Sequence, residues 1–546
     1  MVLKFKFTYK SSDKTLAKFL DFASKQFDCE YKIYQELDFV YLYVKANEEI
    51  LEKFSESLSV YIPMSIYYYD VQIEVVDEIL TLNSICLNEE KTISFCPSCL
   101  KEVENTQSKD FYNAFKSCNI CDGFEEASFL FEDKKVESNI ELFKKIALLI
   151  NEDKKIKIKT LSGTFIFSKI KTLDESSSLL VTNIRKISQI IVENKTDIVA
   201  LVSIEKPQIN FKINEIYRQK NSVKKTNIDI RYPNDLTLHL LALQLEQYDI
   251  SFLNIEEENS DFDYFLDIDC KNDIFNDIFL DIPIIKCFDN KKLILKSNSY
   301  PKNLDNVYEK FNEKNKSQFM TVLAENQLFD SSILNFYIST KDDDGMSYYS
   351  EKIDGLVDIV ESFYIPSSIK EIFEEIQKND GGKKLVENYK NKFEKEYKKA
   401  INTDISMYKN SSFYCYWEIA KIILDFKNSI LENANNCFLE KGPRIDYKLF
   451  DSKKLFHKKF DYISLIKSSI SFKLAGVDEE TISLGFIESL AHFIGRKTDT
   501  INESYEVKAV SLCGDMFTND LFTSLVEKSI TKNFKIYYNK EFMIQK

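Results

Sequence analysis

Glycine is scarce in this sequence, with 11 glycines in 546 residues, about 2% against ~7% in average proteins. Loops that cradle phosphate need glycine, because glycine takes positive φ freely and lets the backbone approach an anion closely. An enzyme of this size that uses nucleotides would normally place several glycines in such loops. The shortage therefore counts against a conventional nucleotide-using enzyme.

Long apolar runs and excess positive charge are also missing. No apolar run approaches the ~18 residues of a membrane span, and the N-terminus MVLKFKFTYKSSDK does not resemble a signal peptide. The net charge of −14 counts against a general nucleic-acid-binding surface, although a local basic patch is compatible with it. Eleven cysteines without a secretory signal indicate a reducing compartment, so we expect a cytoplasmic protein that does not cross a membrane.

Four of the cysteines form two Cys-x-x-Cys pairs separated by eighteen residues. The pairs are Cys96 with Cys99 and Cys118 with Cys121. This spacing is typical of four-cysteine zinc sites, in which all four ligands come from the protein and no position is left for a reacting water. The motif predicts one structural zinc, in preference to four ordinary cysteines or a disulfide pair.

The remaining sequence divides by its periodicity. Residues 1–85 alternate as strand, helix, strand, strand, helix and strand, and the cysteine module spans 86–131. A mixed α/β region follows at 132–300. A more helical region at 301–546 includes one long, buried helix predicted over 412–441, and its Trp417 is expected in a core.

The cysteine module resembles the zinc finger of HypF, the hydrogenase-maturation carbamoyltransferase family, which carries two such modules. Further segments are similar to HypF in the same order along the chain. They are KIKIKTLSGTF from Lys155, IRYPNDLTLHLLALQL, MTVLAENQLFDSSILNF and AVSLCGDMFTNDLF, the last two resembling strands of the C-terminal domain.

The resemblance implies a multidomain α/β fold. Residues 1–85 would form an acylphosphatase-like α+β sandwich, 86–131 the zinc-finger module and 132–300 a YrdC-like α/β domain that makes carbamoyl adenylate. Residues 301–546 would form a shortened actin-like, carbamoyltransferase-like α/β domain. Members of the family use carbamoyl phosphate and ATP, and they transfer the carbamoyl group to a C-terminal cysteine of a partner on the route to the cyanide ligands of nickel–iron hydrogenase.

The first half of the chain departs from the family where phosphate would bind. The acylphosphatase-like region has YKSSDKTLA, without glycine or arginine, where the family has a glycine-rich loop that ends in arginine. Lys159 matches a family lysine, but Thr160 and Ser162 replace glycines and leave only Gly163. The family's Thr-Ser-x-Asn loop corresponds to the acidic FLNIEEENS.

The C-terminal region departs from the family in the same way. EKNKSQF has no histidine where the family has a metal-binding cluster, and Ser339 stands where the family has a metal-binding aspartate. We expect Asp342–Asp344 to form a solvated acidic turn rather than a cation site. Gly514 and Asn519 remain from a nucleotide loop in which Asp515 replaces glycine. His239 is expected to be structural.

These features lead to one hypothesis and two alternatives. The leading hypothesis is a HypF-related protein with eroded catalytic motifs that keeps its scaffold, a structural zinc and a binding surface for hydrogenase-maturation proteins. It assigns no catalytic residue, and Lys159, Gly163, Gly514 and Asn519 are interpreted as remnants of nucleotide sites. The first alternative is an active ATP-dependent carbamoyltransferase of the HypF type. The second is a zinc-dependent protein-binding module unrelated to hydrogenase maturation.

Overall fold

The computed structural model describes residues 1–36, 38–80, 87, 93, 95–121, 127–269, 282–288, 291–353, 355–360, 363–450 and 456–546. The chain divides into two compact units, Met1–Lys302 and Asn303–Lys546. Each unit combines β-sheet with helices, so the prediction of a multidomain α/β protein is confirmed. Among the described helices, none has the length and apolar character needed to span a membrane.

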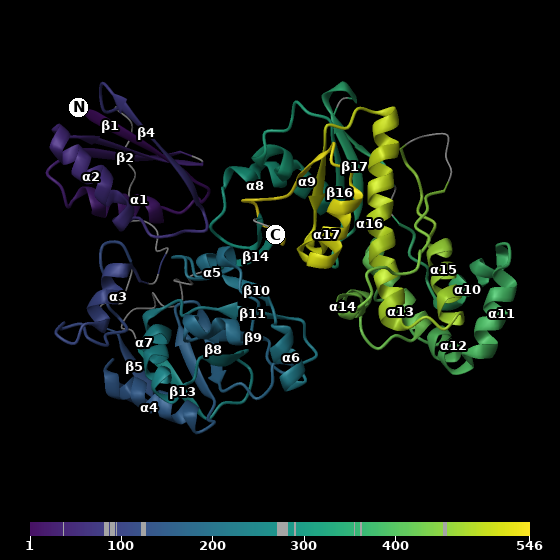
Figure 1. The fold of residues 1–546 in the computed structure, drawn as a ribbon, viewed down its shortest axis with the longest axis horizontal. Coiled ribbons are helices and arrows are strands. Elements are labelled where there is room, and N and C mark those ends of the chain that lie inside the picture. Colours follow the sequence, from purple (N-terminus) through teal and green to yellow (C-terminus); the bar gives the residue numbers. More distant parts are fainter. Residues whose placement is uncertain are drawn as a thin grey trace. The chain divides into compact units, whose positions relative to one another are not determined.

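The first unit begins with a four-stranded antiparallel sheet in the order β2-β3-β1-β4 (Figure 1). Its inner face is aromatic, because alternate residues of the first strand, Phe5, Phe7 and Tyr9, are buried. The ring of Phe5 packs edge-on against Phe54 of the second helix, with the centroids 5.8 Å apart. The elements follow the predicted order: β1 (Val2–Tyr9), α1 (Thr15–Ser24), β2 (Glu30–Glu36), β3 (Phe39–Lys45), α2 (Glu48–Tyr61) and β4 (Tyr68–Val76).

The rest of this unit is built on an eleven-stranded mixed sheet, in the order β15-β14-β10-β11-β9-β12-β8-β7-β13-β5-β6. Helices α4 and α7 pack on it and share one apolar core with its central strands. Helix α7 is buried on almost every side, and its residues are mostly leucine and other apolar types. The helices are α3 (Pro97–Glu104), α4 (Ile140–Asn151), α5 (Lys195–Leu201), α6 (Glu215–Asn221) and α7 (Leu236–Leu245). The strands are β5 (Ser128–Phe131), β6 (Lys134–Val136), β7 (Ile156–Thr160), β8 (Gly163–Ser168), β9 (Ser178–Val181), β10 (Gln208–Lys212), β11 (Asn227–Arg231), β12 (Phe252–Glu256), β13 (Tyr264–Asp269), β14 (Ile284–Phe288) and β15 (Lys291–Lys296).

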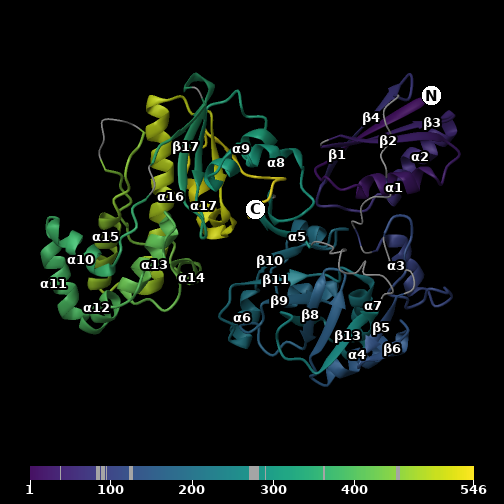
Figure 2. The same cartoon turned by 180° about the vertical axis from the view of Figure 1, so that it is seen from behind.

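The second unit is built on a five-stranded mixed sheet in the order β18-β17-β16-β19-β20. The three strands β16, β17 and β18 form an antiparallel meander, and β19 and β20 add in parallel beside β16. The long helix α16 runs beside this sheet in both views (Figure 2). The strands are β16 (Ile333–Tyr337), β17 (Gly345–Ser350), β18 (Gly355–Asp358), β19 (Ala509–Cys513) and β20 (Lys535–Tyr537). The helices are α8 (Asn303–Tyr308), α9 (Lys314–Glu325), α10 (Ile369–Lys378), α11 (Gly382–Lys392), α12 (Glu394–Ile401), α13 (Phe413–Leu424), α14 (Ile430–Asn436), α15 (Tyr462–Leu474), α16 (Glu479–Ser504) and α17 (Asp520–Ser529).

Two predicted elements of the second unit were wrong in detail. The apolar stretch from Met320 is the end of helix α9, and the strand of that segment begins only at Ile333. The single helix predicted over 412–441 is two helices, α13 and α14, because Asp425 takes the left-handed conformation that ends α13. Trp417 is fully buried, as predicted, and its ring N–H donates to the Tyr447 hydroxyl at 2.7 Å.

Candidate functional sites

The four cysteines predicted as metal ligands lie together in the first unit. Cys96 immediately precedes helix α3 and Cys99 lies in its first turn, while Cys118 and Cys121 lie further along, in the irregular segment 116–121. Their Sγ atoms lie within 4.8 Å of one another, with 3.6 Å between Cys96 and Cys118 and 3.4 Å between Cys99 and Cys121. A tetrahedral Zn–S₄ centre with bonds near 2.3 Å would place sulfurs about 3.8 Å apart. The cluster therefore fits a metal ion of this kind.

Other features of the cluster also suit a thiolate-bound metal. All four cysteines are free thiols, and three are buried, with Cys118 partly exposed. The thiols hydrogen-bond one another, which holds the pKa of Cys118 below its usual range and raises the pKa of Cys121 and Cys99. The backbone N–H of Ile120 donates to the Cys118 sulfur at 3.4 Å, a contact that favours the thiolate. The four cysteines can thus hold a metal ion without any further ligand.

The cysteine cluster is part of a small apolar core made by separate segments of the first unit. Phe19 of α1, Ile93 and Ile120 are buried around it, and Ile204 packs against it from the loop after α5. A metal ion here would therefore stabilise more than its own loop, because its ligands are packed against both the first helix and the mixed sheet's connections.

The loop between β1 and α1, where the resemblance to HypF places the acylphosphatase phosphate loop, holds the Asp13 carboxylate. Asp13, which is 7% exposed, accepts hydrogen bonds from the hydroxyls of Tyr9 and Ser11 at 2.6 Å each. It also accepts the backbone N–H of Thr15 at 2.9 Å. The donors of this loop are thus directed at an internal negative charge.

Lys159 and Gly163, interpreted as remnants of a nucleotide site, lie on either side of the β7–β8 turn. The Lys159 ammonium forms an ion pair with Asp267 of the neighbouring strand β13 at 3.2 Å. The turn's backbone N–H groups are bound within the protein, since Leu161 N–H donates to the Asp235 carboxylate at 3.2 Å and Ser162 N–H donates to the Thr160 hydroxyl at 3.2 Å. Burial raises the pKa of Asp235 to about 6.

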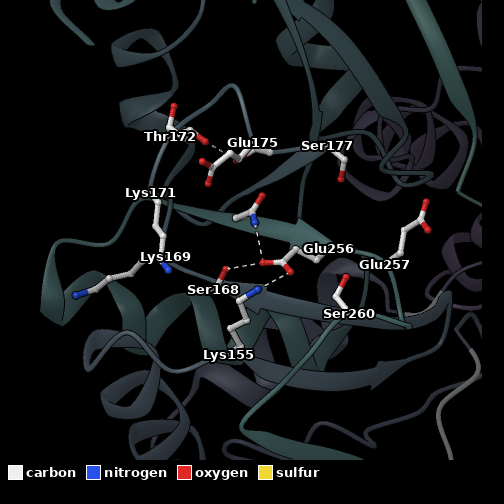
Figure 3. Close-up of a pocket in the computed structure, with 12 residues that line it drawn as sticks. Lys155, Ser168, Lys169, Lys171, Thr172, Glu175, Ser177, Glu256, Glu257 and Ser260 are labelled. Carbon is white, nitrogen blue, oxygen red and sulfur yellow. Dashed lines mark hydrogen bonds and ion pairs between the residues drawn. The ribbon is translucent and has the colours of Figure 1, made fainter. Parts of the chain in front are cut away.

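The acidic segment at the end of β12 lines a cavity of about 420 Å³ (Figure 3). Glu256 lies near the centre of the drawn side chains and pairs with the Lys155 ammonium at 2.7 Å. The Asn254 amide and the Ser168 hydroxyl also donate to Glu256, at 3.1 and 3.4 Å. Lys169 instead donates to the Asn151 carbonyl at 2.5 Å. The charge of Lys155 is therefore neutralised by Glu256 within the cavity, whereas Lys169 is hydrogen-bonded to the Asn151 carbonyl.

In the second unit, the loop after β16 has four successive backbone N–H groups that all donate to protein oxygens. Ser339 N–H donates to Asp344 and Thr340 N–H to Asp515, both at 2.8 Å. The N–H groups of Lys341 and Asp342 both donate to the Ser339 hydroxyl at 3.1 Å. None of these four donors is available to a phosphate without breaking an existing hydrogen bond.

The expectation of a solvated acidic turn at Asp342–Asp344 is only partly right: Asp343 is exposed, but Asp343 and Asp344 also accept hydrogen bonds from within the protein. Asp344 is only partly exposed and also accepts the Phe413 N–H at 2.6 Å, and desolvation raises its pKa well above the usual range. Asp343 accepts the Ser411 N–H at 2.6 Å. These aspartates hold the loop against the start of helix α13, a long-range contact that the local sequence pattern does not reveal.

A cavity of about 620 Å³ lies beside this loop, and most of the charged residues that line it are acidic. Asp342, Asp343 and Asp358 line it, together with Lys314 and Asn315 from the start of α9. The stretch without histidine, EKNKSQF, thus does lie beside the aspartates. His457 also lines the cavity, although sequence analysis assigned it no role.

Gly514 and Asn519, the other two predicted nucleotide-site remnants, both have structural roles. Gly514 has φ +96°, and a Cβ there would lie 2.2 Å from the Ile338 carbonyl oxygen. The Asn519 side chain accepts the Phe522 N–H at 3.0 Å and so caps helix α17. The structure brings these two residues together in the second unit, whereas Lys159 and Gly163 belong to the first.

His239 has the structural role that was expected. It lies on α7, is 8% exposed, and its Nε2 is 2.7 Å from the Glu104 carboxylate at the end of α3. The hydrogen bond to His239 lowers the pKa of Glu104. This pair attaches the cysteine-bearing helix to the core of the mixed sheet.

Comparison with known proteins shows which solved structures share this fold. No family model matches the chain. Protein HydE of Wolinella succinogenes is 22% identical over 526 residues, which cover 92% of this chain and 91% of that protein. Full-length HypF in its phosphate- and nucleotide-bound form superposes with a TM-score of 0.65, and HypF of T. kodakarensis with 0.69. Each match covers 100% of this chain and 96% of the HypF chain at 12% identity.

The chain has the HypF fold. The resemblance to HypF inferred from the sequence is therefore confirmed at the level of fold and over the full length of the chain. At 12% identity most side chains differ between this chain and the HypF structures. The chemistry of the sites must therefore be argued from the residues of this chain.

Proposed function

We propose that this chain is a HypF-related protein that has lost the carbamoyl chemistry of the family and acts in hydrogenase maturation by binding partner proteins. The fold supports a HypF-related role. The loss of carbamoyl chemistry is supported by three loops in which the resemblance places a bound phosphate. In this chain, a carboxylate of the protein binds to each of these loops. Asp13, Asp235 and Asp515 each accept one backbone N–H of these loops, from Thr15, Leu161 and Thr340 respectively.

A carboxylate in a phosphate loop opposes binding in two ways. It occupies an N–H donor that the phosphate oxygens would need. It also repels the ligand, since two like charges ~4 Å apart cost about 4 kcal/mol at an effective dielectric near 20. That repulsion corresponds to roughly a thousandfold loss of affinity at each loop.

The four cysteines support a structural zinc as the retained cofactor. All four ligand positions would be filled by Cys96, Cys99, Cys118 and Cys121, so the ion would have no site for substrate. We propose that zinc holds the cysteine module in place. The unpaired thiols elsewhere in the described chain support a reducing, cytoplasmic compartment.

The same proposal divides the chain at the predicted boundaries: an acylphosphatase-like domain (1–85), a zinc module (86–131), a YrdC-like domain (132–300) and a carbamoyltransferase-like domain (301–546). Lys159, Gly163, Gly514 and Asn519 then mark where nucleotide sites have been lost. The partners would be hydrogenase-maturation proteins.

One observation favours the alternative of an active carbamoyltransferase. The 420 Å³ cavity lies beside the segment that corresponds to a nucleotide loop, and Lys155, Lys169 and Lys171 are among its lining residues. A cavity of this size with several lysines could accept an anionic substrate if Glu256 and its neighbours rearranged.

An assay of carbamoyl transfer distinguishes the proposed loss of activity from the active alternative. Purified chain is incubated with carbamoyl phosphate, MgATP and a peptide ending in cysteine, and an active HypF serves as the positive control. We expect no ATP-dependent carbamoylation above background, together with capture of hydrogenase-maturation proteins by the tagged chain. Turnover at a rate comparable to the control would establish the active alternative instead.

A further inference from the structure

A third cavity, in the second unit, collects positive charge in a chain whose net charge is −14. It has a volume of about 350 Å³ and lies between helix α16 and the loop 441–445 that precedes α15. Arg444 and Lys441 come from the loop, and His492 and Arg496 from the helix. The chain has only five arginines, and two of them line this cavity.

The loop is held rigidly against the helix. A Cβ on Gly442 would lie 2.1 Å from the Gly485 backbone nitrogen, so at this point the two backbones are in direct contact. The Gly442 N–H donates to the Glu488 carboxylate at 2.9 Å, and the Ile445 N–H donates to the Ser489 hydroxyl at 2.9 Å. Arg444 is therefore presented from a fixed backbone.

The helix residues of the cavity share one face. Glu488, His492 and Arg496 follow one another at intervals of four residues, so their side chains project to the same side of α16. Neither Arg444 nor Arg496 has an ion pair or side-chain hydrogen bond with another residue in the described parts of the chain. Both guanidinium groups are thus available to a ligand.

We propose that this cavity binds a phosphate group, as a free ion or as a phosphomonoester. The cavity is lined by three side chains that are positively charged at neutral pH, Lys441, Arg444 and Arg496, and by one carboxylate, Glu488. The net charge of its lining is therefore about +2. A phosphate group carries a charge of −1.5 to −2 at neutral pH and balances this excess, whereas a single carboxylate does not. Guanidinium groups also bind phosphate oxygens in pairs, with a geometry that ammonium groups lack.

This site shares no residue with the three carboxylate-filled loops, so the inference is independent of the proposed loss of carbamoyl chemistry. The probe is inorganic phosphate, titrated into the full-length protein by calorimetry at constant low ionic strength, with acetate titrated in parallel. We expect saturable phosphate binding with a Kd below about 1 mM and much weaker acetate binding.

The double variant Arg444→Gln plus Arg496→Gln should weaken phosphate binding at least about tenfold, because it removes both guanidinium groups. The matched control Arg185→Gln removes an exposed arginine from the first unit and should leave the Kd unchanged. Lys441→Gln alone should weaken binding to a smaller extent and tests the site if the double variant does not fold. No saturable binding, equal affinity for acetate, or an unchanged Kd in both cavity variants would overturn the assignment.

Discussion

Asp515 accepts the backbone N–H of Thr340 at 2.8 Å and also the Thr340 hydroxyl, across 175 residues of sequence. This contact joins the loops that follow the adjacent parallel strands β16 and β19. In the resemblance to HypF, position 515 is the glycine at which the backbone meets nucleotide. Here a carboxylate lies at that position, and it holds the loop together from within.

Replacing Asp515 with alanine should destabilise the second unit. Two hydrogen bonds to a charged acceptor are lost and the Thr340 N–H is left without a partner, for a cost of about 2–4 kcal/mol. Chemical denaturation of the variant measures this loss. The control Asp499→Ala removes an exposed carboxylate of α16 and should change stability by less than about 0.5 kcal/mol. Equal effects of the two substitutions would show that the Asp515 contact contributes little.

Two glycines with positive φ allow the cost of backbone strain to be measured separately from the cost of a steric clash. Gly476 has φ +87° with open space around its Cβ position, whereas Gly514 has φ +96° with the Ile338 carbonyl 2.2 Å from that position. Gly476→Ala should cost about 1–2 kcal/mol, from backbone strain alone. Gly514→Ala should cost at least about 3 kcal/mol, since the loop must also move. A comparison of the two unfolding midpoints tests this difference, and similar midpoints would contradict it.

The zinc site should be lost when one cysteine is removed from each pair. Wild-type protein should contain one zinc per chain, and Cys96→Ser plus Cys118→Ser should contain none. Structural zinc contributes on the order of 10 kcal/mol in finger peptides, so the double variant should lose the fold of its cysteine module. Elemental analysis and limited proteolysis check both points. Cys437→Ser, at a cysteine outside the cluster, is the control and should keep its zinc. Zinc retained by the double variant would refute the assignment.

Ionisation of Asp235 should make stability depend on pH. Its folded-state pKa, about 6, is above the unfolded value of ~3.9, so its contribution is fully present below about pH 4 and is lost as the pH rises through 6. Asp235→Asn, which still has a side-chain oxygen to cap α7, removes this dependence. The stability of the variant relative to wild type should therefore increase by up to about 3 kcal/mol between pH 4 and pH 7.

Denaturant unfolding at a series of pH values measures this difference. The control Asp499→Asn replaces an exposed aspartate and should give a nearly constant difference across the same range. A constant difference for Asp235→Asn as well would mean that the carboxylate ionises normally in the folded protein.

The first loop should not support acyl phosphate hydrolysis. The Asp13 carboxylate takes the hydroxyls of Tyr9 and Ser11 and the N–H of Thr15, and the segment YKSSDKTLA has no arginine to bind the substrate. Full-length protein should hydrolyse acetyl phosphate no faster than buffer alone. Hydrolysis clearly above that background, lost on Asp13→Ala, would contradict this prediction and would show that the loop binds the substrate without an arginine.

The sequence predicts those features that depend on local pattern. Strict alternation identifies the strands of 1–85, and the spacing of Cys96, Cys99, Cys118 and Cys121 predicts the cluster, because each pair needs only one turn of chain to converge. The colinear order of weak motifs was enough to indicate the HypF fold. The resemblance also misled, since it predicted a strand from Met320, although that run completes helix α9.

The features that were missed depend on contacts between distant residues. Asp344 looks like part of an exposed acidic turn, but it is only partly exposed and accepts the N–H of Phe413, 69 residues away, as well as that of Ser339. Arg444 and Arg496 lie 52 positions apart, and only the close backbone packing at Gly442 and Gly485 brings their segments together. The sequence shows that glycines and arginines have been lost from the phosphate loops, but not that Asp13, Asp235 and Asp515 each accept one backbone N–H in them.

The most direct test of the account is calorimetry of the full-length protein with MgATP. Saturating inorganic phosphate is present in the buffer, so that any general phosphate site is already filled. Because carboxylates occupy the loops that would bind the nucleotide, we predict no saturable ATP binding up to millimolar concentration. A micromolar Kd that is abolished by Lys159→Ala would contradict the loss of nucleotide chemistry and would make this chain an active member of the HypF type.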